Sequence, residues 1–275
     1  MTPIRKVKVM TDVNFSGMEP ISLRFIEKPK LVDPVFIEGL PGVGNIGKLA
    51  AEHLIDEIDA VKFAELHSKY FPPQVLVDED GIARLVNNEF YYKKSETASH
   101  PDLIILVGDY QGLTPDGQYD LAYRILNIVK DMGAKRIYTL GGYGVGKLVE
   151  KPRVFGAATG THLVDEMKSH GAFFSKTDPS GGIVGASGLL LGLGKLYGID
   201  AVCLMGETSG YFVDPKSAEA VLKVLTKALG ITIDYTELEA KAKQIDQITM
   251  KIRELEEAQN APLRGRKEDD LGYIG

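Results

Sequence analysis

The sequence predicts an α/β fold: a three-layer α/β/α domain on a mostly parallel sheet, followed by a C-terminal helix and a tail. Three observations lead to this fold class. Strand-like and helix-like segments alternate for most of the 275 residues. Segment 102–109 is an apolar run between two aspartates, typical of a strand buried on both faces of a parallel sheet. Repeated strand–helix–strand units place helices on both faces of such a sheet.

The predicted elements follow one another in a regular order. Short apolar or alternating runs predict strands at 4–13, 21–27, 35–38, 61–66, 102–109, 136–140 and 200–205. Apolar residues at helical spacing predict helices at 45–58, 115–132, 161–170, 184–197 and 216–229. Residues 74–93 resemble an antiparallel hairpin that turns at Asp80-Gly81, a pair that favours tight turns.

The composition changes after Gly230. Residues 236–259 contain no Gly or Pro, and Leu238, Ile245 and Ile252 fall seven residues apart, which predicts a helix with an imperfect heptad seam. This seam either docks on its own domain or associates with other copies. The polar, glycine-bearing end of the chain is not expected to fold alone. We therefore expect an α/β domain at 1–230, a helical extension at 231–262 and a flexible tail at 263–275.

Composition and charge argue against several classes of function. The net charge of −6 and the pI near 5.5 disfavour a general nucleic-acid binder. No apolar run approaches the roughly 20 residues that cross a bilayer. The single cysteine, Cys203, excludes an internal disulfide and favours a reducing setting. We expect a cytoplasmic protein without nucleic-acid or membrane partners.

One glycine loop, EGLPGVGNIGKL, fits two nucleotide-binding patterns. Gly42, Gly44 and Gly47 form G-x-G-x-x-G, and Gly42 to Lys48 form the phosphate-loop pattern without its final Ser or Thr, because Leu49 follows Lys48. The topology expected around the loop differs from that of a dinucleotide-binding domain. We favour a tight strand-to-helix turn, in which glycines allow close packing, and leave anion binding open.

Two other glycine-rich segments have structural interpretations. Residues 141–147 are expected to form a mobile surface loop at the end of a strand. Gly185, Gly188 and Gly192 repeat every three or four residues, so we expect one helix face that packs closely on a neighbour.

The candidate catalytic residues are weak. Ser187 lacks the spacing of a nucleophile elbow, and Cys203 lies in an apolar run. The five histidines lack the spacing of a zinc site. Glu38, Asp109 and Glu207 each lie near a strand's carboxyl end, where a catalytic cluster could assemble. Because no constellation is complete, we predict no catalytic residues, no metal and no cofactor.

The order of several short motifs is more specific than any one of them. These motifs are Glu38–Gly47, Tyr70-Phe-Pro-Pro73, Gly108-Asp109, Gly141-Gly142-Tyr143, Gly182–Gly192 and Gly206-Glu207. Together they resemble the proteasome assembly chaperone two family, above all its archaeal members. The resemblance implies a fold related to nucleoside phosphorylases, homo-oligomers, and a non-enzymatic role in assembling the proteasome core particle. Some archaeal relatives have instead been described as ATP-dependent carboxylate–amine ligases.

The resemblance also implies that the C-terminal tail docks on a partner. Leu271, Tyr273, Ile274 and Gly275 are the expected partner-binding residues on an otherwise charged tail. Proteasome-binding tails often have Tyr next to last, whereas Tyr273 is third from the end of this sequence and follows a glycine.

Three functions therefore remain after the sequence analysis. The leading hypothesis is a homo-oligomeric chaperone or scaffold that binds proteasome core-particle subunits or a related family member. One alternative is an ATP-dependent ligase, with Lys48 at phosphate and Asp109 or Glu207 at magnesium. The other is an architectural protein that binds another family member and never the proteasome.

Overall fold

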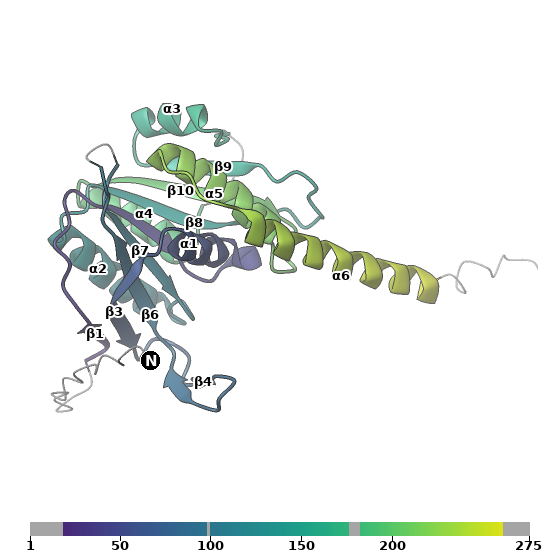
Figure 1. Ribbon diagram of the computed structural model, residues 1–275, viewed down its shortest axis with the longest axis horizontal. Helices are drawn as coiled ribbons and strands as arrows, with labels where there is room; N and C mark the ends of the chain where they lie inside the picture. The colour runs from purple at the N-terminus through teal and green to yellow at the C-terminus, as the bar shows by residue number, and fades with distance from the viewer. Residues whose placement is uncertain (1–18, 98–99, 176–181, 261–275) are drawn as a thin grey trace, which may run out of the picture.

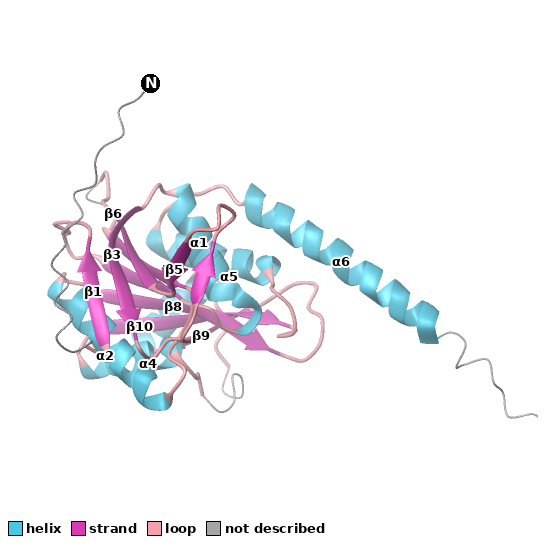
Figure 2. Ribbon diagram, turned by 90° about the horizontal axis from the view of Figure 1, so that it is seen from below, coloured by secondary structure: helices cyan, strands magenta, loops and turns pink. Residues whose placement is uncertain are grey.

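A computed structural model describes residues 19–97, 100–175 and 182–260. It contains one eight-stranded sheet, a separate two-stranded hairpin, and helices on both faces of the large sheet (Figures 1 and 2). A long helix projects away from this body. No helix among the described residues is long and apolar enough to cross a membrane.

The large sheet has the order β1-β3-β6-β7-β2-β8-β10-β9. In chain order its strands are β1 (Ile21–Phe25), β2 (Val35–Gly39), β3 (Val61–Ser68), β6 (Asn88–Lys93), β7 (Leu103–Gly108), β8 (Arg136–Gly144), β9 (Val154–Ala158) and β10 (Asp200–Thr208).

The sheet is mixed: among the described strands, three pairings are parallel and four antiparallel, so the predicted mostly parallel arrangement is limited to the centre. The four central strands β7, β2, β8 and β10 are parallel to one another. The outer strands β1, β3 and β6 on one side and β9 on the other pair antiparallel. The α/β class is confirmed, and the parallel arrangement holds for the centre, where helices join successive strands. The strand expected at 4–13 lies outside the described residues.

Helices cover the two faces of the sheet. The helix α1 (Ile46–Glu57) and the helix α5 (Pro215–Leu229) pack on one face; α2 (Pro115–Asp131) and α4 (Ala186–Leu196) pack on the other. Strand β2 shows the alternation that this requires: Val35 and Ile37 belong to the first core, whereas Phe36 belongs to the second. The short helix α3 (Thr161–Ser169) also adds to the first core.

Capping residues explain where the long helices begin. Thr114 precedes α2 and its side-chain oxygen accepts a hydrogen bond from the amide of Gly117 at 3.2 Å. Asp214 caps α5 in the same way, accepting from the amide of Ser217 at 3.0 Å. A proline follows each cap at the first helical position, where its missing N–H costs nothing.

The hairpin is shorter than the sequence suggests. Its strands are β4 (Val75–Val77) and β5 (Ala83–Leu85), which turn around Asp80-Gly81 as predicted. The prediction that the hairpin continues to residue 93 is wrong, because β6 leaves it and pairs with β3 and β7 in the large sheet. The buried side chain of Phe90 explains this choice, since it packs into the second core.

Two other segments differ from the sequence prediction. Residues Gly141–Gly144 continue strand β8 and pair with the end of β10, so the expected mobile loop is wrong for these residues. Strand β9 was not predicted; its residues Val-Phe-Gly-Ala-Ala have little strand signal, and pairing with β10 organises it.

The glycines of α4 also behave differently from the prediction. A Cβ atom on Gly188 would lie 2.0 Å from the carbonyl oxygen of Ile183, so Gly188 packs on the chain that enters its own helix. A Cβ on Gly192 would meet no atom within 4 Å. The expected close contact with a neighbouring element is therefore wrong for Gly192.

Candidate interaction site

The loop between β2 and α1 carries the glycine pattern. It includes a short 3-10 turn at Val43–Asn45, in which Gly44 has the left-handed φ of 65°. Gly47 lies in the first turn of α1, and a Cβ on it would stand 2.2 Å from the carbonyl oxygen of Leu140 in β8. Such an approach is far inside van der Waals contact. Gly47 therefore allows α1 to lie directly on β8.

Glycines from separate sequence motifs meet around the start of this helix. A Cβ on Gly39 would lie 2.3 Å from the Cβ of Ala51, and a Cβ on Gly142 would lie 2.3 Å from the carbonyl oxygen of Val43. These contacts give the glycines a packing function that any tight strand-to-helix turn can share. Anion binding at Gly42, Gly44, Gly47 and Lys48 stays a prediction.

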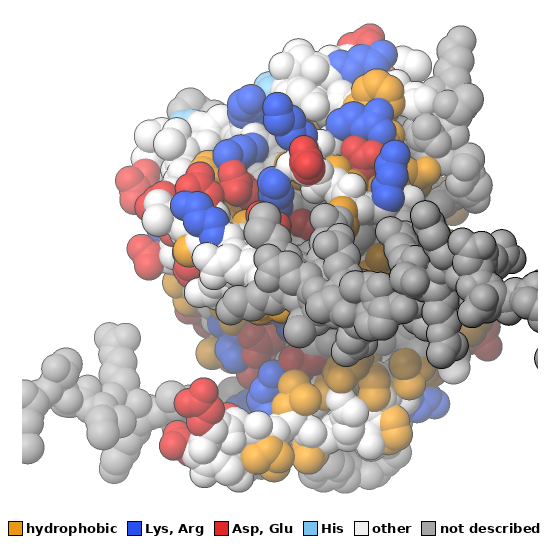
Figure 3. All heavy atoms as spheres, turned by 90° about the vertical axis from the view of Figure 1, so that its right-hand side faces the viewer, with side chains coloured by type: hydrophobic (Ala, Val, Ile, Leu, Met, Phe, Trp, Pro, Cys, Tyr) orange, Lys and Arg blue, Asp and Glu red, His pale blue; other side chains and the backbone are white. Residues whose placement is uncertain are grey.

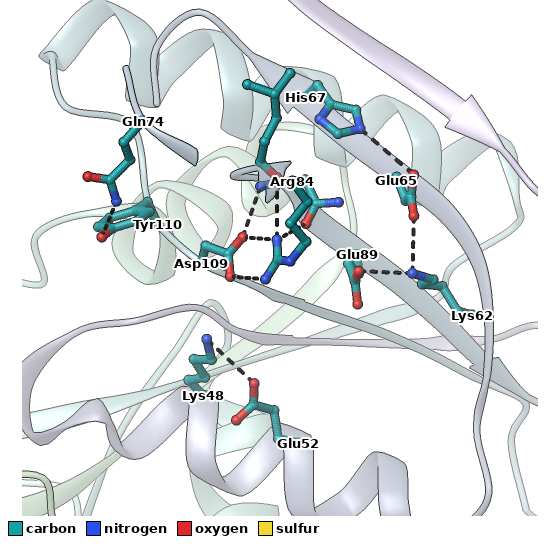
Figure 4. Close-up of polar contacts among 12 residues, drawn as sticks. Lys48, Glu52, Lys62, Glu65, His67, Gln74, Arg84, Glu89, Asp109 and Tyr110 are labelled. Carbon is teal, nitrogen blue, oxygen red and sulfur yellow. Dashed lines mark hydrogen bonds and ion pairs between the residues drawn. The ribbon is translucent and has the colours of Figure 1, made fainter. Parts of the chain in front are cut away.

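Lys48 faces a partner on its own helix. Its Nζ atom lies 3.5 Å from Oε1 of Glu52, one turn further along α1 (Figure 4). Such a pair contributes a few tenths of a kcal/mol to an exposed helix, roughly 0.3–0.5 kcal/mol.

Asp109 at the end of β7 binds the projecting hairpin. The two terminal nitrogens of the Arg84 guanidinium, Nη1 and Nη2, donate to it at 2.6 and 2.9 Å, and the amide of Asn87 donates at 3.1 Å (Figure 4). Burial raises the pKa of the Asp109 carboxyl, but these hydrogen bonds outweigh burial and hold the pKa below its usual value. Asp109 is thus the anchor of the hairpin.

The neighbouring strands β3 and β6 carry a charged network of their own. Lys62 donates to Glu65 at 3.1 Å and to Glu89 at 3.0 Å (Figure 4). The hydroxyl of Tyr91 donates to the other oxygen of Glu89 at 2.7 Å. In this network the positive charge of Lys62 on β3 is paired with the carboxylates of Glu65 on β3 and Glu89 on β6.

Glu207 at the end of β10 forms an ion pair with Arg153. The arginine donates to both carboxylate oxygens at 2.9 Å. These hydrogen bonds hold the pKa of Glu207 below its usual value, against the opposing effect of burial. The Arg153 guanidinium also lies over the rings of Phe155 and Phe173.

Glu38 at the end of β2 is fully buried. Its oxygens accept from the amide of Leu40 at 3.0 Å and from the hydroxyl of Ser187 at 2.9 Å. Burial raises the pKa of Glu38 to about 7, although both hydrogen bonds act to lower it. The three carboxylates proposed for a catalytic cluster thus have different partners, and Ser187 serves as a donor to one of them.

The two remaining possibilities for a reactive site are a cysteine nucleophile and a metal site. Cys203 is buried in β10, and burial raises the pKa of its thiol to about 12, so it carries no thiolate at neutral pH. In the part of the chain that the structure describes, no three or more His, Cys, Asp or Glu side chains are grouped so as to hold a metal ion.

The helix α6 (Thr236–Asn260) is fixed to the body at its first turns. Leu238 is fully buried in the core that also contains α1 and α5. Just before the helix, the carbonyl of Asp234 accepts from Nε2 of His53 at 2.7 Å, and the hydroxyls of Tyr235 and Thr226 lie 2.7 Å apart. Beyond this base the helix extends away from the body (Figures 1 and 2).

The residues of the predicted heptad seam differ in how far they are buried. Leu238 docks on its own domain, Ile245 is half-buried, and Ile248 is 54% exposed. The side chains of Ile252 and Leu255 lie outside the described part. The prediction that the seam docks on its own domain thus holds for its first position.

A pocket of about 380 Å³ lies at the base of α6. It is enclosed by three segments: residues 148–150, residues 209–216 and the second and third turns of α6. Its apolar wall consists of Leu148, Val149, Phe212, Val213, Pro215, Ala242 and Ile245. No sequence pattern marks this pocket, because its walls come from segments that only the fold brings together.

The hairpin presents a second apolar surface. The register pairs Val75 with Leu85 and Val77 with Ala83, which places these four side chains on one face. Val75, Val77 and Leu85 are 50–63% exposed. Figure 3 shows hydrophobic side chains gathered on the lowest part of the molecule, where the hairpin lies. Only Ala83-Arg84-Leu85 alternates in the sequence, whereas Val75-Leu76-Val77 is apolar throughout, so the sequence pattern does not single out this face.

The tail residues Leu271, Tyr273, Ile274 and Gly275 lie outside the described residues, so their expected contacts stay predictions. The structure gives only the end of the described chain before them, Asn260 at the far end of α6.

Comparison with known proteins identifies the family. The family model described as the PAC2 family matches residues 36–253. The chain belongs to the PAC2 family. An uncharacterized protein of Methanocaldococcus jannaschii is 46% identical over 247 residues, which are 89% of this chain and 93% of that protein.

Solved structures of PAC2 relatives share the fold. The crystal structure of Pyrococcus furiosus PbaB, an archaeal proteasome activator, is similar with a TM-score of 0.82 and 45% identity, covering 86% of this chain and all of that chain. The structure of Pyrococcus furiosus PbaA, an archaeal homolog of proteasome-assembly chaperone, gives a TM-score of 0.72 and 31% identity, covering 90% of this chain and 97% of that chain. The suspected family and the α/β fold are thereby confirmed.

Proposed function

We propose that this PAC2 protein is a non-enzymatic, homo-oligomeric chaperone or scaffold of the cytoplasm that binds proteasome core-particle subunits through residues 263–275. The observation that carries the proposal is the similarity over most of the chain to a proteasome activator and to a homolog of a proteasome-assembly chaperone.

The geometry of α6 supports a role for the tail. The helix is fixed at Leu238 and Asp234 and points away from the body, so residues 261–275 start at a distance from the sheet. Leu271, Tyr273 and Ile274 are apolar residues in a charged segment, which suits anchors that become buried on a partner. Several tails on one homo-oligomer would bind by avidity even if each contact were weak.

The local chemistry supports a non-enzymatic role. The ligase alternative needs Lys48 at phosphate and Asp109 or Glu207 at magnesium. Lys48 pairs with Glu52, Asp109 with Arg84, and Glu207 with Arg153. Each of the three side chains thus has an ion-pair partner within the protein, which is a structural role that needs no ATP or magnesium.

A pull-down with an archaeal proteasome core particle tests the tail. We expect the chain with Leu271, Tyr273 and Ile274 changed to Ser to lose most of its recovery of the core particle, because the apolar anchors are gone. Gly272→Ser, in the same segment with all three anchors kept, is the matched control and should retain it. Equal recovery by the two variants would remove the tail from the mechanism.

Two further measurements separate the alternatives. Native mass spectrometry of the protein alone and with the core particle should show a homo-oligomer and a complex; a complex only with another PAC2 protein would favour the architectural alternative. Calorimetry with ATP and magnesium should show no saturable binding. Saturable binding that disappears in Lys48→Ala would overturn the non-enzymatic proposal.

A further inference from the structure

The pocket at the base of α6 combines an apolar wall with charged and polar residues. Leu148, Phe212 and Val213 line it and are each about half exposed. The helix contributes Ala242 and the half-buried Ile245. Apolar side chains left partly in water around a concave surface mark a place where another apolar group can bind.

The segment that follows α6 can reach this pocket. Ile245 and Asn260 are 15 residues apart on the helix, which corresponds to about 22 Å at 1.5 Å per residue. Residues 261–270 can span up to about 33 Å at 3.3 Å per residue. The chain between the end of α6 and Leu271 is therefore long enough to return to the pocket with length to spare.

The chemistry of that segment fits the pocket. Leu271, Tyr273 and Ile274 supply three apolar side chains within four residues. The residues before them are first basic, at 264–267, and then acidic, at 268–270.

The charged residues of the pocket offer partners for both signs. Lys216 lines it together with Glu150, Asp214 and Asp246. The Asp214 carboxylate already accepts from the amide and the hydroxyl of Ser217. Among the lining residues, Lys216 has the charge that suits the acidic stretch, and Glu150 and Asp246 have the charge that suits the basic stretch.

We propose that the pocket at the base of α6 is a binding site for residues 271–274 of the same chain. Tethering supports this occupant over a free ligand, because a short linker holds the segment at a millimolar effective concentration near the site. The regulatory consequence rests on the proposed function: the same anchors cannot occupy the pocket and a proteasome subunit at once, so docking would hold the tail back until a partner competes for it.

The composition of the chain permits a direct test by fluorescence. The sequence has no tryptophan, and its single cysteine, Cys203, is fully buried. In the full chain, Gly275→Cys can carry a thiol-linked bimane, which tryptophan quenches on contact. Phe212→Trp then places the quencher in the pocket while keeping an aromatic ring there.

We expect bimane emission from the Phe212→Trp chain to be lower by at least about twofold than from a matched control, because a tethered segment occupies its site most of the time. The control is Tyr123→Trp, also an exposed aromatic position, but on α2 at the other face of the sheet. Adding Ile245→Lys to the Phe212→Trp chain should restore emission, as should changing Leu271, Tyr273 and Ile274 to Ser.

The outcomes decide the proposal. Equal emission from the Phe212→Trp and Tyr123→Trp chains would overturn it, and so would quenching that persists in both disrupting variants. Quenching that disappears when the doubly modified chain is diluted into excess unmodified chain would show docking on a neighbouring copy and overturn the own-chain version. The assay contains no proteasome, so its failure is distinct from a failed pull-down.

Discussion

The centre of the sheet and the two projecting elements use apolar residues in opposite ways. In the centre, β2, β8 and α1 are packed so closely that glycine is the only residue that fits at Gly47 and Gly142. In the hairpin and in α6, apolar side chains such as Val77 and Ile248 remain more than half exposed. The comparison shows that close packing is confined to the body, whereas the projections leave apolar surface in contact with water.

The largest expected effect is at the most crowded glycine. Gly47→Ala places a Cβ 2.2 Å from a backbone carbonyl that cannot move without shifting β8. We expect a loss of about 3 kcal/mol, the upper end for an overpacked core, in the free energy of unfolding, measured with urea. Gly192→Ala is the matched control, because its Cβ meets nothing within 4 Å in a helix, and it should be neutral or stabilising by up to about 1 kcal/mol. Similar losses in both variants would contradict the packing role of Gly47.

The second expected effect compares the two ends of the α6 seam. Leu238→Ala removes a fully buried side chain and should lower the free energy of unfolding by about 2–4 kcal/mol. Ile248→Ala, at a position that is 54% exposed, should change it by less than about 0.5 kcal/mol. A large loss at Ile248 would show that the outer part of α6 is covered in the assembled protein.

The third prediction concerns the buried carboxylate of the central sheet. The pKa of Glu38 rises from 4.5 to about 7 on folding, so the folded state holds the proton more tightly than the unfolded state. Ionisation therefore destabilises the fold as pH rises from about 4.5 to 7. Relative to the unmodified chain, Glu38→Gln should gain on the order of 2 kcal/mol between pH 5 and pH 8 in chemical denaturation. A difference between the two chains that is independent of pH would contradict this assignment.

The smallest expected effect is local and lies in the hairpin. Arg84→Lys keeps the charge but loses the two-nitrogen contact with Asp109, so amide hydrogens at 75–85 should exchange faster, corresponding to about 1 kcal/mol of local stability. Lys135→Arg, at an exposed ion pair with Asp33 on the opposite side of the fold, is the control. Unchanged exchange in the hairpin would mean that other contacts hold it.

Local patterns were sufficient for most of the fold. Helical spacing located α1, α2, α5 and α6, and the apolar run at 102–109 located β7. Prediction failed where pairing between distant segments decides the structure. Residues 141–144 are rich in glycine, a loop signal, yet they form the end of β8 because β10 pairs with them and Val43 approaches closely.

The candidate site was less predictable than the fold. Glycine spacing correctly marked the turn after β2, but it could not tell packing from phosphate binding, since both require a backbone without side chains. The pocket depends on loops 148–150 and 209–216 meeting α6, and no local pattern encodes that meeting. Sequence could mark Leu271, Tyr273 and Ile274 as unusual, because apolar residues in a charged segment stand out without any knowledge of the fold.

The anchoring of Leu238 has a mechanical consequence for everything beyond it. The first turns of α6 pack on the body through Leu238 and, at the pocket, through Ala242 and Ile245, so residues 247–260 form a stiff arm about 21 Å long. The described chain therefore ends at the tip of this arm, at a distance from the sheet. Lengthening the arm by whole helical turns would move its tip outward in steps of about 5.4 Å, so the spacing of a partner could be measured with the helix as a ruler.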